Sequence, residues 1–458
     1  TLLDKFFMIV CKGNNRDKLH KLIIFNLIKS FMLKMKKRRF INNIKEISFY
    51  LFLISLFLFL IPNIYIFFIK NPFLTSQAIG RLLVLMSFLL NIVISFIDES
   101  FHFFSFAKGK FITWAVLTFL FIQSLSLIFA INIPAFLLRY KDILLTIVFF
   151  TLSQNYKNNF NKIIYTLSLG TLINILYQLI LIFNSNLFIN LFSNFIYQKH
   201  FNFVLANLER GRIYVDFYNE AIIPFIFLKL NKKSFNRIFN IMFIFFIVFL
   251  AIMSNFRTRI LMVIFSVGLS VFFLIKSSLM NKFLFIISLF FLLYSFFSYS
   301  YYFNFNQRLY IRINEVEEIL NKKTLLSRLN QLRNTIDMAN ASFFGVGLGN
   351  YFDNVSAVEK NKDFIISESV KFIKLGAEEY VHNIFGIILA ESGYIGLIVF
   401  LCLLIFFIKN DILVLKKNNR YKKSLVISFW TLFIYGFFNP IVPASYQVLF
   451  WLLRGLLL

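Results

Sequence analysis

The residues of this sequence best suited to chemistry lie between Ser327 and Gly396, in the one long stretch that is not mainly apolar. His382 is the only histidine there, and histidine is the side chain best matched to proton transfer near neutral pH. Glu378 and Glu379 precede it by four and three positions, close enough on a helix to orient the imidazole. A Glu-x-x-His spacing can also bind metal, but no second such pair exists. His382 is therefore a candidate base or a structural histidine, and we predict no metal site and no cofactor.

Arginines form the second set of candidates. Arginine suits phosphate because its planar fork binds two oxygens at once and keeps its charge. An arginine near hydrocarbon is costly and usually functional, although any single one could instead reach lipid headgroups or pair with an acid. As a set, they favour a ligand that carries phosphate. The arginines concerned are Arg210, Arg212, Arg257, Arg259, Arg328 and Arg333.

Three glycines, Gly345, Gly347 and Gly349, stand together in the run GVGLGNY. A G-x-G-x-G run lacks the strand, the helix and the downstream acid of a dinucleotide fingerprint. Its consecutive backbone amides could help to hold an anion. A simple turn is the other interpretation, and both stand on the sequence alone.

The elements that must position these groups are membrane helices. Hydrophobic residues make up 59% of the 458 positions and charged residues only 15%, whereas soluble domains are about half apolar and a quarter charged. The sequence therefore predicts an all-α, polytopic integral membrane protein with 10 to 12 transmembrane helices, since each span needs about 20 apolar residues. The expected spans are 47–69, 80–97, 111–130, 142–155, 163–183, 214–230, 238–254, 260–275, 283–303, 384–408, 424–438 and 444–458.

The formal net charge of +27 fits a membrane protein without a nucleic-acid partner, because the basic residues gather in alternate breaks between spans. Such breaks face the cytoplasm. We expect residues 1–46 to form a basic cytoplasmic N-terminus, of which 1–34 could be a translation-start artefact. Transmembrane helices 1–9 would occupy 47–303, a large outer loop 304–380, and the C-terminal transmembrane helices 381–458.

The outer loop carries ten basic and ten acidic residues, which indicates a small folded subdomain. Unstructured loops of that length are uncommon unless they are functional. Leu329, Leu332 and Ile336 recur at helical spacing, so the segment after Ser327 is expected to form an amphipathic helix.

At this point the residues resemble a known family. His382 and Asn383, followed after nine residues by Gly393 and after two more by Gly396, are similar to the membrane re-entry signature of bacterial O-antigen ligases. Those enzymes share a superfamily with the polymerases of O-antigen and other oligosaccharide repeat units.

The resemblance covers roughly residues 205 to 405 and extends to the GVGLGNY run. It includes Arg328 and also Arg259, with Arg257 as its rival. A looser match is GRIYVDFYNEA at 211–221, where Phe217-Tyr218-Asn219 stand in place of the Pro-Asn common in the family. A role for Asn219 is therefore not expected.

The resemblance implies an inverting, metal-independent glycosyltransferase in the bacterial inner membrane, with its active site facing the periplasm. Its donor would be a glycan on a polyprenyl diphosphate such as undecaprenyl diphosphate. Arg259 and Arg328, with Arg257 as the alternative, would hold the diphosphate, and His382 would be the general base. The supporting residues would be Glu378, Glu379, Asn383, Gly345, Gly347, Gly349, Gly393 and Gly396.

The acceptor separates the alternatives. Transfer to lipid A core would make the protein a ligase, which the re-entry signature slightly favours, and transfer to another repeat unit would make it a polymerase. A different class of function, a transporter, is the remaining alternative: the protein would then be a flippase for the same lipid-linked sugar. Transporters of that kind show internal repeats and charges within their spans, and the sequence shows no repeat of its spans.

Overall fold

The computed structural model describes residues 39–65, 74–97, 111–209, 219–229, 236–254, 256–275, 278, 280, 282–284, 287, 291, 323–351, 353–354, 381–439 and 444–458. Within these residues the regular structure is helical, and the only β contacts are isolated bridges, Ile64 with Ile196 and Tyr65 with Thr75. The all-α prediction is confirmed. The helices in chain order are Arg39–Leu60, α3 (Ser76–Ile97), α4 (Phe111–Leu125), η4 (Ser126–Phe129), α5 (Ile133–Asn155), η5 (Lys157–Asn159), α6 (Phe160–Phe183), α7 (Ser185–Phe192), α8 (Gln198–Glu209), η6 (Asn219–Ile222), α9 (Ile223–Lys229), α10 (Asn236–Met253), α11 (Arg257–Leu274), α15 (Lys323–Ala341), α18 (Ile384–Lys416), α19 (Arg420–Phe438) and α20 (Ala444–Leu457).

The polytopic membrane fold is also confirmed. In the described part of the chain, four helical segments are long and apolar enough to cross a bilayer: Arg39–Leu60, Ser76–Ile97, Lys157–Phe183 and Ile384–Lys416. Shorter apolar helices occupy Thr113–Phe129, Asn219–Leu228, Ile238–Met253 and Thr258–Leu274. A described helix overlaps each expected span except 283–303, most of which lies outside the described residues.

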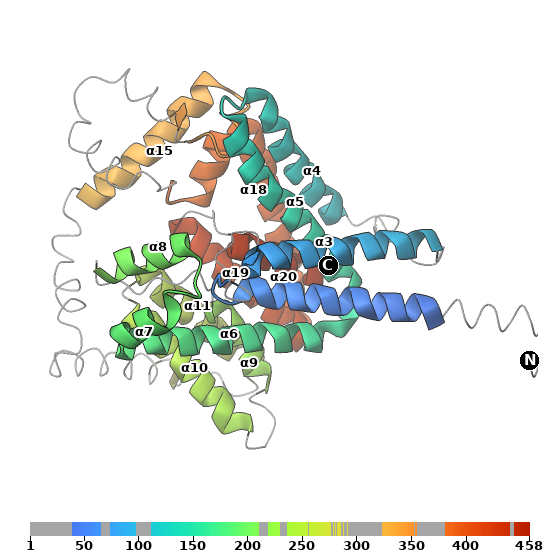
Figure 1. Ribbon diagram of the computed structural model, residues 1–458, viewed down its shortest axis with the longest axis vertical. Coiled ribbons are helices and arrows are strands. Elements are labelled where there is room, and N and C mark those ends of the chain that lie inside the picture. The colour runs from blue at the N-terminus through green and yellow to red at the C-terminus, as the bar shows by residue number, and fades with distance from the viewer. Residues whose placement is uncertain are drawn as a thin grey trace, which may run out of the picture.

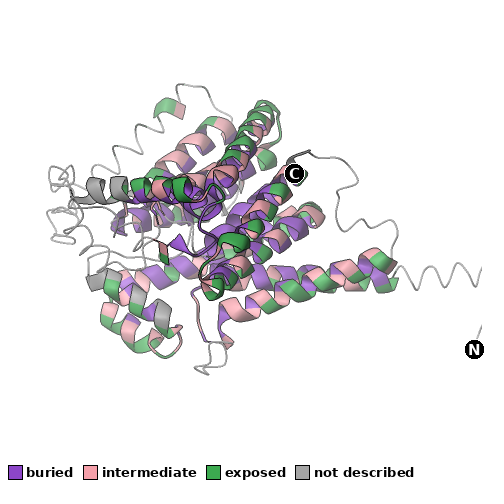
Figure 2. Cartoon of the chain, turned by 90° about the horizontal axis from the view of Figure 1, so that it is seen from above, coloured by how far each residue is buried: buried purple, intermediate pink, exposed green. Residues whose placement is uncertain are grey.

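Helices distant in sequence lie side by side. α5 packs along α20, α18 lies against α4 and α15, and α19 lies between α11 and α20. α15 stands at the upper left edge of the molecule, next to the start of α18, whereas α6, α10 and α11 occupy the lower half (Figure 1). Buried faces turn towards the centre of the bundle, and many outer faces carry exposed side chains (Figure 2).

Two helices are longer than expected, one with a capping residue at its start and the other with a buried ion pair near its end. α5 begins at Ile133, not at residue 142, since Asn132 caps it by accepting a hydrogen bond from the Ala135 amide at 3.1 Å. α18 continues to Lys416 through the charged segment expected to be a loop. Asp411 in that segment is buried in a two-point ion pair with Arg454 of α20, at 2.8 and 2.6 Å.

α15 confirms the helix expected after Ser327, but the structure assigns its two faces differently from those of a globular helix. Gln331, Asn334 and Thr335 are buried, whereas Leu332 and Ile336 are exposed. The side chain of Leu329 lies outside the described part of the chain. Polar side chains of α15, together with Met338 and Ala339, therefore pack against the protein.

Candidate active site

His382 lies where α15 meets the beginning of α18. Its backbone amide donates a hydrogen bond to Oε1 of Gln331 at 3.3 Å. Gln331 stands one helical turn after Arg328 on α15, and residues three apart on a helix are neighbours. The Arg328 side chain is exposed and that of His382 half-buried. The fold thus brings His382 and Arg328, separated in the sequence, to one junction.

Asn383 fixes the start of α18. Its Oδ1 accepts hydrogen bonds from the amides of Phe385 at 2.7 Å and Gly386 at 3.4 Å, which is the preferred role of asparagine at a helix N-terminus. His382 directly precedes this capping residue. The hydrogen bond of its own amide to Gln331 and the cap at Asn383 together fix its backbone position.

The glycine loop, residues 342–350, follows α15 and packs against residues 390–394 of α18 without exposing its amides. Every backbone amide from residue 345 to 350 donates within the protein, which leaves none of them for an anion. The acceptors are Ser342 O, Ala390 O, Glu391 O, Ser126 Oγ, Glu391 Oε1 and Gly347 O. In this structure the run is a structural turn.

Gly393 breaks α18 where the glycine loop docks. Its φ of 65° and ψ of −165° interrupt the helix, so the carbonyls of Ala390 and Glu391 are open to the amides of Val346 at 2.8 Å and Gly347 at 3.1 Å. A Cβ on Gly393 would overlap the carbonyl oxygen of Phe343. The Gly393 position of the sequence signature is thus required by backbone packing.

The other glycines also admit close neighbours. A Cβ on Gly345 would lie 2.5 Å from the Gly393 nitrogen, and one on Gly347 would lie 2.8 Å from Ala130. One on Gly349 would lie 2.7 Å from the Ala135 oxygen. The loop is therefore wedged between the α4–α5 turn and the break in α18. Gly396 leaves room for the side chain of Ser392 across that break.

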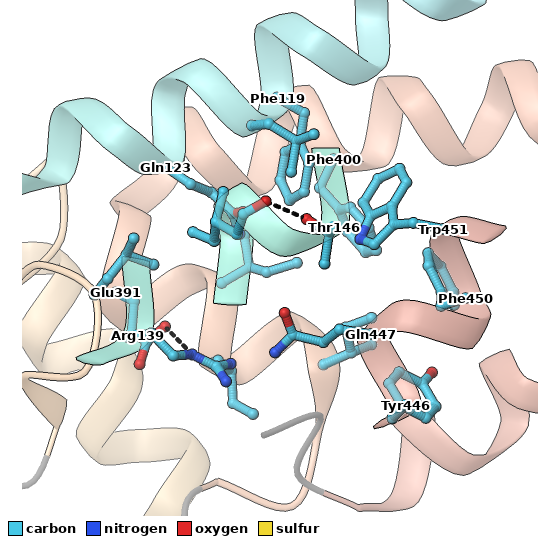
Figure 3. A pocket seen from close by; sticks show the side chains of 16 residues that line it. Phe119, Gln123, Arg139, Thr146, Glu391, Phe400, Tyr446, Gln447, Phe450 and Trp451 are labelled. Carbon is cyan, nitrogen blue, oxygen red and sulfur yellow. Dashed lines mark hydrogen bonds and ion pairs between the residues drawn. The ribbon is translucent and has the colours of Figure 1, made fainter. Parts of the chain in front are cut away.

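Glu391 and Arg139 are candidate residues that the sequence analysis missed. Both are buried, with Arg139 Nε 4.0 Å from Glu391 Oε2, and Oε1 of the same carboxylate accepts the Gly349 amide at 2.9 Å. They border a cavity of about 50 Å³ between α4, α5, α18 and α20. In Figure 3 the pair lies on one side of this cavity, with Gln447 and the rings of Phe119, Phe400, Phe450 and Trp451 around it.

Arg259 belongs to a different cluster. It is buried at the start of α11, where its Nε lies 2.6 Å from Oε1 of Glu220 and its Nη1 donates to Oε1 of Gln178 at 3.2 Å. Within the described residues, Arg259 Nη2, Glu220 Oε2 and Gln178 Nε2 are buried without a hydrogen-bond partner. Arg259 therefore sits with α6 and η6, while His382 and Arg328 sit where α15 meets α18. The cluster leaves one guanidinium nitrogen for a polar ligand.

Several predicted residues cannot be placed. Glu378, Glu379, Arg210 and Arg212 lie outside the described residues, as does the side chain of Arg257, whose backbone begins α11. Over the described residues, no group of three or more His, Cys, Asp or Glu side chains could hold a metal ion.

Residues 242–401 match the family model described as O-antigen ligase. This match supports the O-antigen ligase and polymerase superfamily. A comparison with curated proteins found no match to the chain. The match, together with the apolar helices, supports glycan transfer of the ligase or polymerase type, by a multi-pass bacterial membrane protein.

The O-antigen ligase match spans α10, α11, α15, the glycine loop and the first half of α18. Arg139, Gln178 and Glu220 lie before it. Glu220 lies in the looser sequence match at 211–221, whereas Arg139 and Gln178 lie in helices that resemble the family only as spans. Glu391 lies inside the expected span 384–408, and this was a signal that could have revealed it, because charges in hydrocarbon are usually paired. Arg139 lies in the break between the expected spans 111–130 and 142–155, where the sequence gives no such signal.

Proposed function

We propose that this member of the O-antigen ligase superfamily transfers a glycan from a polyprenyl diphosphate carrier to a saccharide acceptor at the periplasmic membrane face. The observation that supports it best is the junction between α15 and α18. There Gln331 holds the His382 amide one turn from the exposed Arg328, inside the segment that matches the family.

The proposed step is a single displacement that inverts the anomeric carbon. An acceptor hydroxyl oxygen attacks that carbon, and the bond from the carbon to the diphosphate oxygen breaks with its electron pair leaving on the diphosphate. His382 takes the hydroxyl proton as general base, a contribution of about 10²–10⁴-fold. Arginine stabilises the charge that develops on the leaving diphosphate.

Two arginines are proposed for that role, and the structure distinguishes their settings. Arg328 is exposed one turn from the residue that holds His382. Arg259 is buried, with two of its nitrogens already bound to Glu220 and Gln178. We therefore propose Arg328 as the main diphosphate ligand at the reacting end and Arg259 as a second contact through Nη2.

The test uses purified protein in proteoliposomes with a lipid-linked glycan donor. His382→Ala is expected to abolish transfer while the protein stays in the membrane. Arg328→Lys keeps the charge but loses the two-point fork, so turnover should fall, whereas Arg333→Lys on an exposed position of the same helix should change it little. An active His382→Ala variant would remove His382 from the mechanism. Equal transfer by the Arg328→Lys and Arg333→Lys variants would remove Arg328.

Two acceptors fit this chemistry, and a surface-polysaccharide gel of a deletion strain separates them. Loss of long chains with one repeat unit still on the core lipid indicates a polymerase. Long glycan that accumulates on the carrier without reaching the core indicates a ligase. An unchanged pattern contradicts the proposed role in this glycan. For a metal-independent reaction, addition of EDTA should leave transfer unchanged.

A further inference from the structure

The outward face of α15 has the wrong chemistry for contact with water. Gln331 and Asn334 are 8% and 4% exposed, whereas Leu332 and Ile336 are 42% and 40% exposed. A surface helix of a soluble domain turns its apolar stripe to the core. On α15 the polar residues Gln331 and Asn334 pack inward together with Met338 and Ala339, whereas Leu332 and Ile336 face outward. The two exposed apolar side chains suit contact with another apolar medium.

The exposed apolar surface continues beyond α15. Phe343 and Phe344 follow the helix and are exposed. The ring of Phe344 stacks on that of Phe129, with 5.0 Å between centroids and 4° between planes. Through this contact the α15 face joins the turn between α4 and α5.

That turn is itself strongly apolar and exposed. Ile128 and Ile131 are 74% and 75% exposed, at the ends of apolar helices that belong to the membrane bundle. Side chains of this kind at the end of a spanning helix lie in lipid. The exposed apolar surface of α15 is therefore continuous with that of the turn between α4 and α5.

The remaining exposed positions of α15 suit the lipid headgroups. Arg328 and Arg333 are exposed on this helix. Arg328 precedes Leu332 by four residues and so lies at one end of the row formed by Leu332 and Ile336, whereas Arg333 lies beside that row. An amphipathic helix with a basic polar side and an apolar side lies in the plane of the membrane, with its apolar side about 5–10 Å into the headgroup and acyl boundary.

We propose that α15, together with Phe343 and Phe344, is an interfacial element that lies on the bilayer through Leu332, Ile336 and the two phenylalanines. The occupant of this face is the acyl-chain boundary of the membrane lipids. The proposal does not depend on the glycan chemistry, but it would hold Arg328 at the level of the lipid phosphates.

The test is nitroxide accessibility in proteoliposomes of phosphatidylethanolamine and phosphatidylglycerol. Cys11→Ser and Cys402→Ser remove both native cysteines. Single labels then go at Leu332→Cys and Ile336→Cys, with Arg333→Cys as the matched control on the same helix. Oxygen, which partitions into lipid, and a water-soluble nickel chelate compete as relaxing agents. The ratio of oxygen to nickel collisions should be higher for both apolar positions than for Arg333.

Three results would overturn the proposal. Equal nickel access at Leu332 and Arg333 would mean that water covers the face. Exclusion of both agents with spin–spin broadening would mean that a second copy of the chain covers it, and exclusion without broadening would mean that another part of the same chain does. Two labelled positions protect the test against one misfolded variant. The readout needs no transfer activity, so its failure and that of the proposed function are distinguishable.

Discussion

Replacement of Gly393 by alanine should undock the glycine loop from α18. The native φ of 65° with ψ of −165° is a region open essentially to glycine alone and costs another residue about 1–3 kcal/mol. The new Cβ would also overlap the Phe343 carbonyl oxygen. The Cβ is fixed to the backbone of residue 393 and the carbonyl belongs to the backbone of Phe343, so no side-chain rotation can relieve the overlap. The glycine loop and α18 must therefore separate.

Separation breaks the three backbone hydrogen bonds between the glycine loop and α18. Each contributes about 0.5–1.5 kcal/mol, so with the backbone strain the free energy of unfolding should fall by about 3–7 kcal/mol. Proteins have only about 5–15 kcal/mol in total. Gly393→Ala should therefore be severely destabilised and inactive in transfer.

The measurement is unfolding by sodium dodecyl sulfate in mixed micelles, alongside the transfer assay. Gly268→Ala is the matched control, because no heavy atom lies within 4 Å of its added Cβ and alanine favours a helix by about 1 kcal/mol over glycine. The control should be at least as stable as the native protein. A Gly393→Ala protein as stable and active as the control would refute the packing argument.

Two further predictions concern buried carboxylates. Asp411→Ala leaves Arg454 without its two-point partner and should cost about 3–5 kcal/mol, whereas Asp142→Ala, whose pair spans 3.6 Å and is partly exposed, should cost less than about 1 kcal/mol. The same detergent titration measures both, and equal losses would contradict the assignment. Glu391→Gln keeps an acceptor for the Gly349 amide, so it should be more stable than Glu391→Ala, which orphans that amide at about 1–3 kcal/mol. Equal destabilisation by the two variants would show that the carboxylate charge, and not this hydrogen bond, matters.

Some features of this protein followed from the sequence alone. Apolar runs of spanning length dictate an all-α membrane protein, because only helices and closed barrels satisfy every backbone group in lipid. The spacing of His382, Asn383, Gly393 and Gly396 resembled the O-antigen ligases, and the family match at residues 242–401 supports that resemblance. Local patterns of this kind are visible because they depend on neighbours in the chain.

Other features were decided only by the tertiary structure. Gln331 meets His382, and Glu391 meets Gly349, across long stretches of sequence, and no local pattern encodes such partners. Helical spacing located α15 but not the direction of its apolar stripe, since periodicity defines two faces without saying which one meets the protein. Arg259 was a candidate from its residue type and position, and only the structure shows that it pairs with Glu220 from another helix. Tertiary packing determines which charged residues from distant parts of the chain become neighbours. The sequence could therefore identify candidate residues but could not predict which of them lie together.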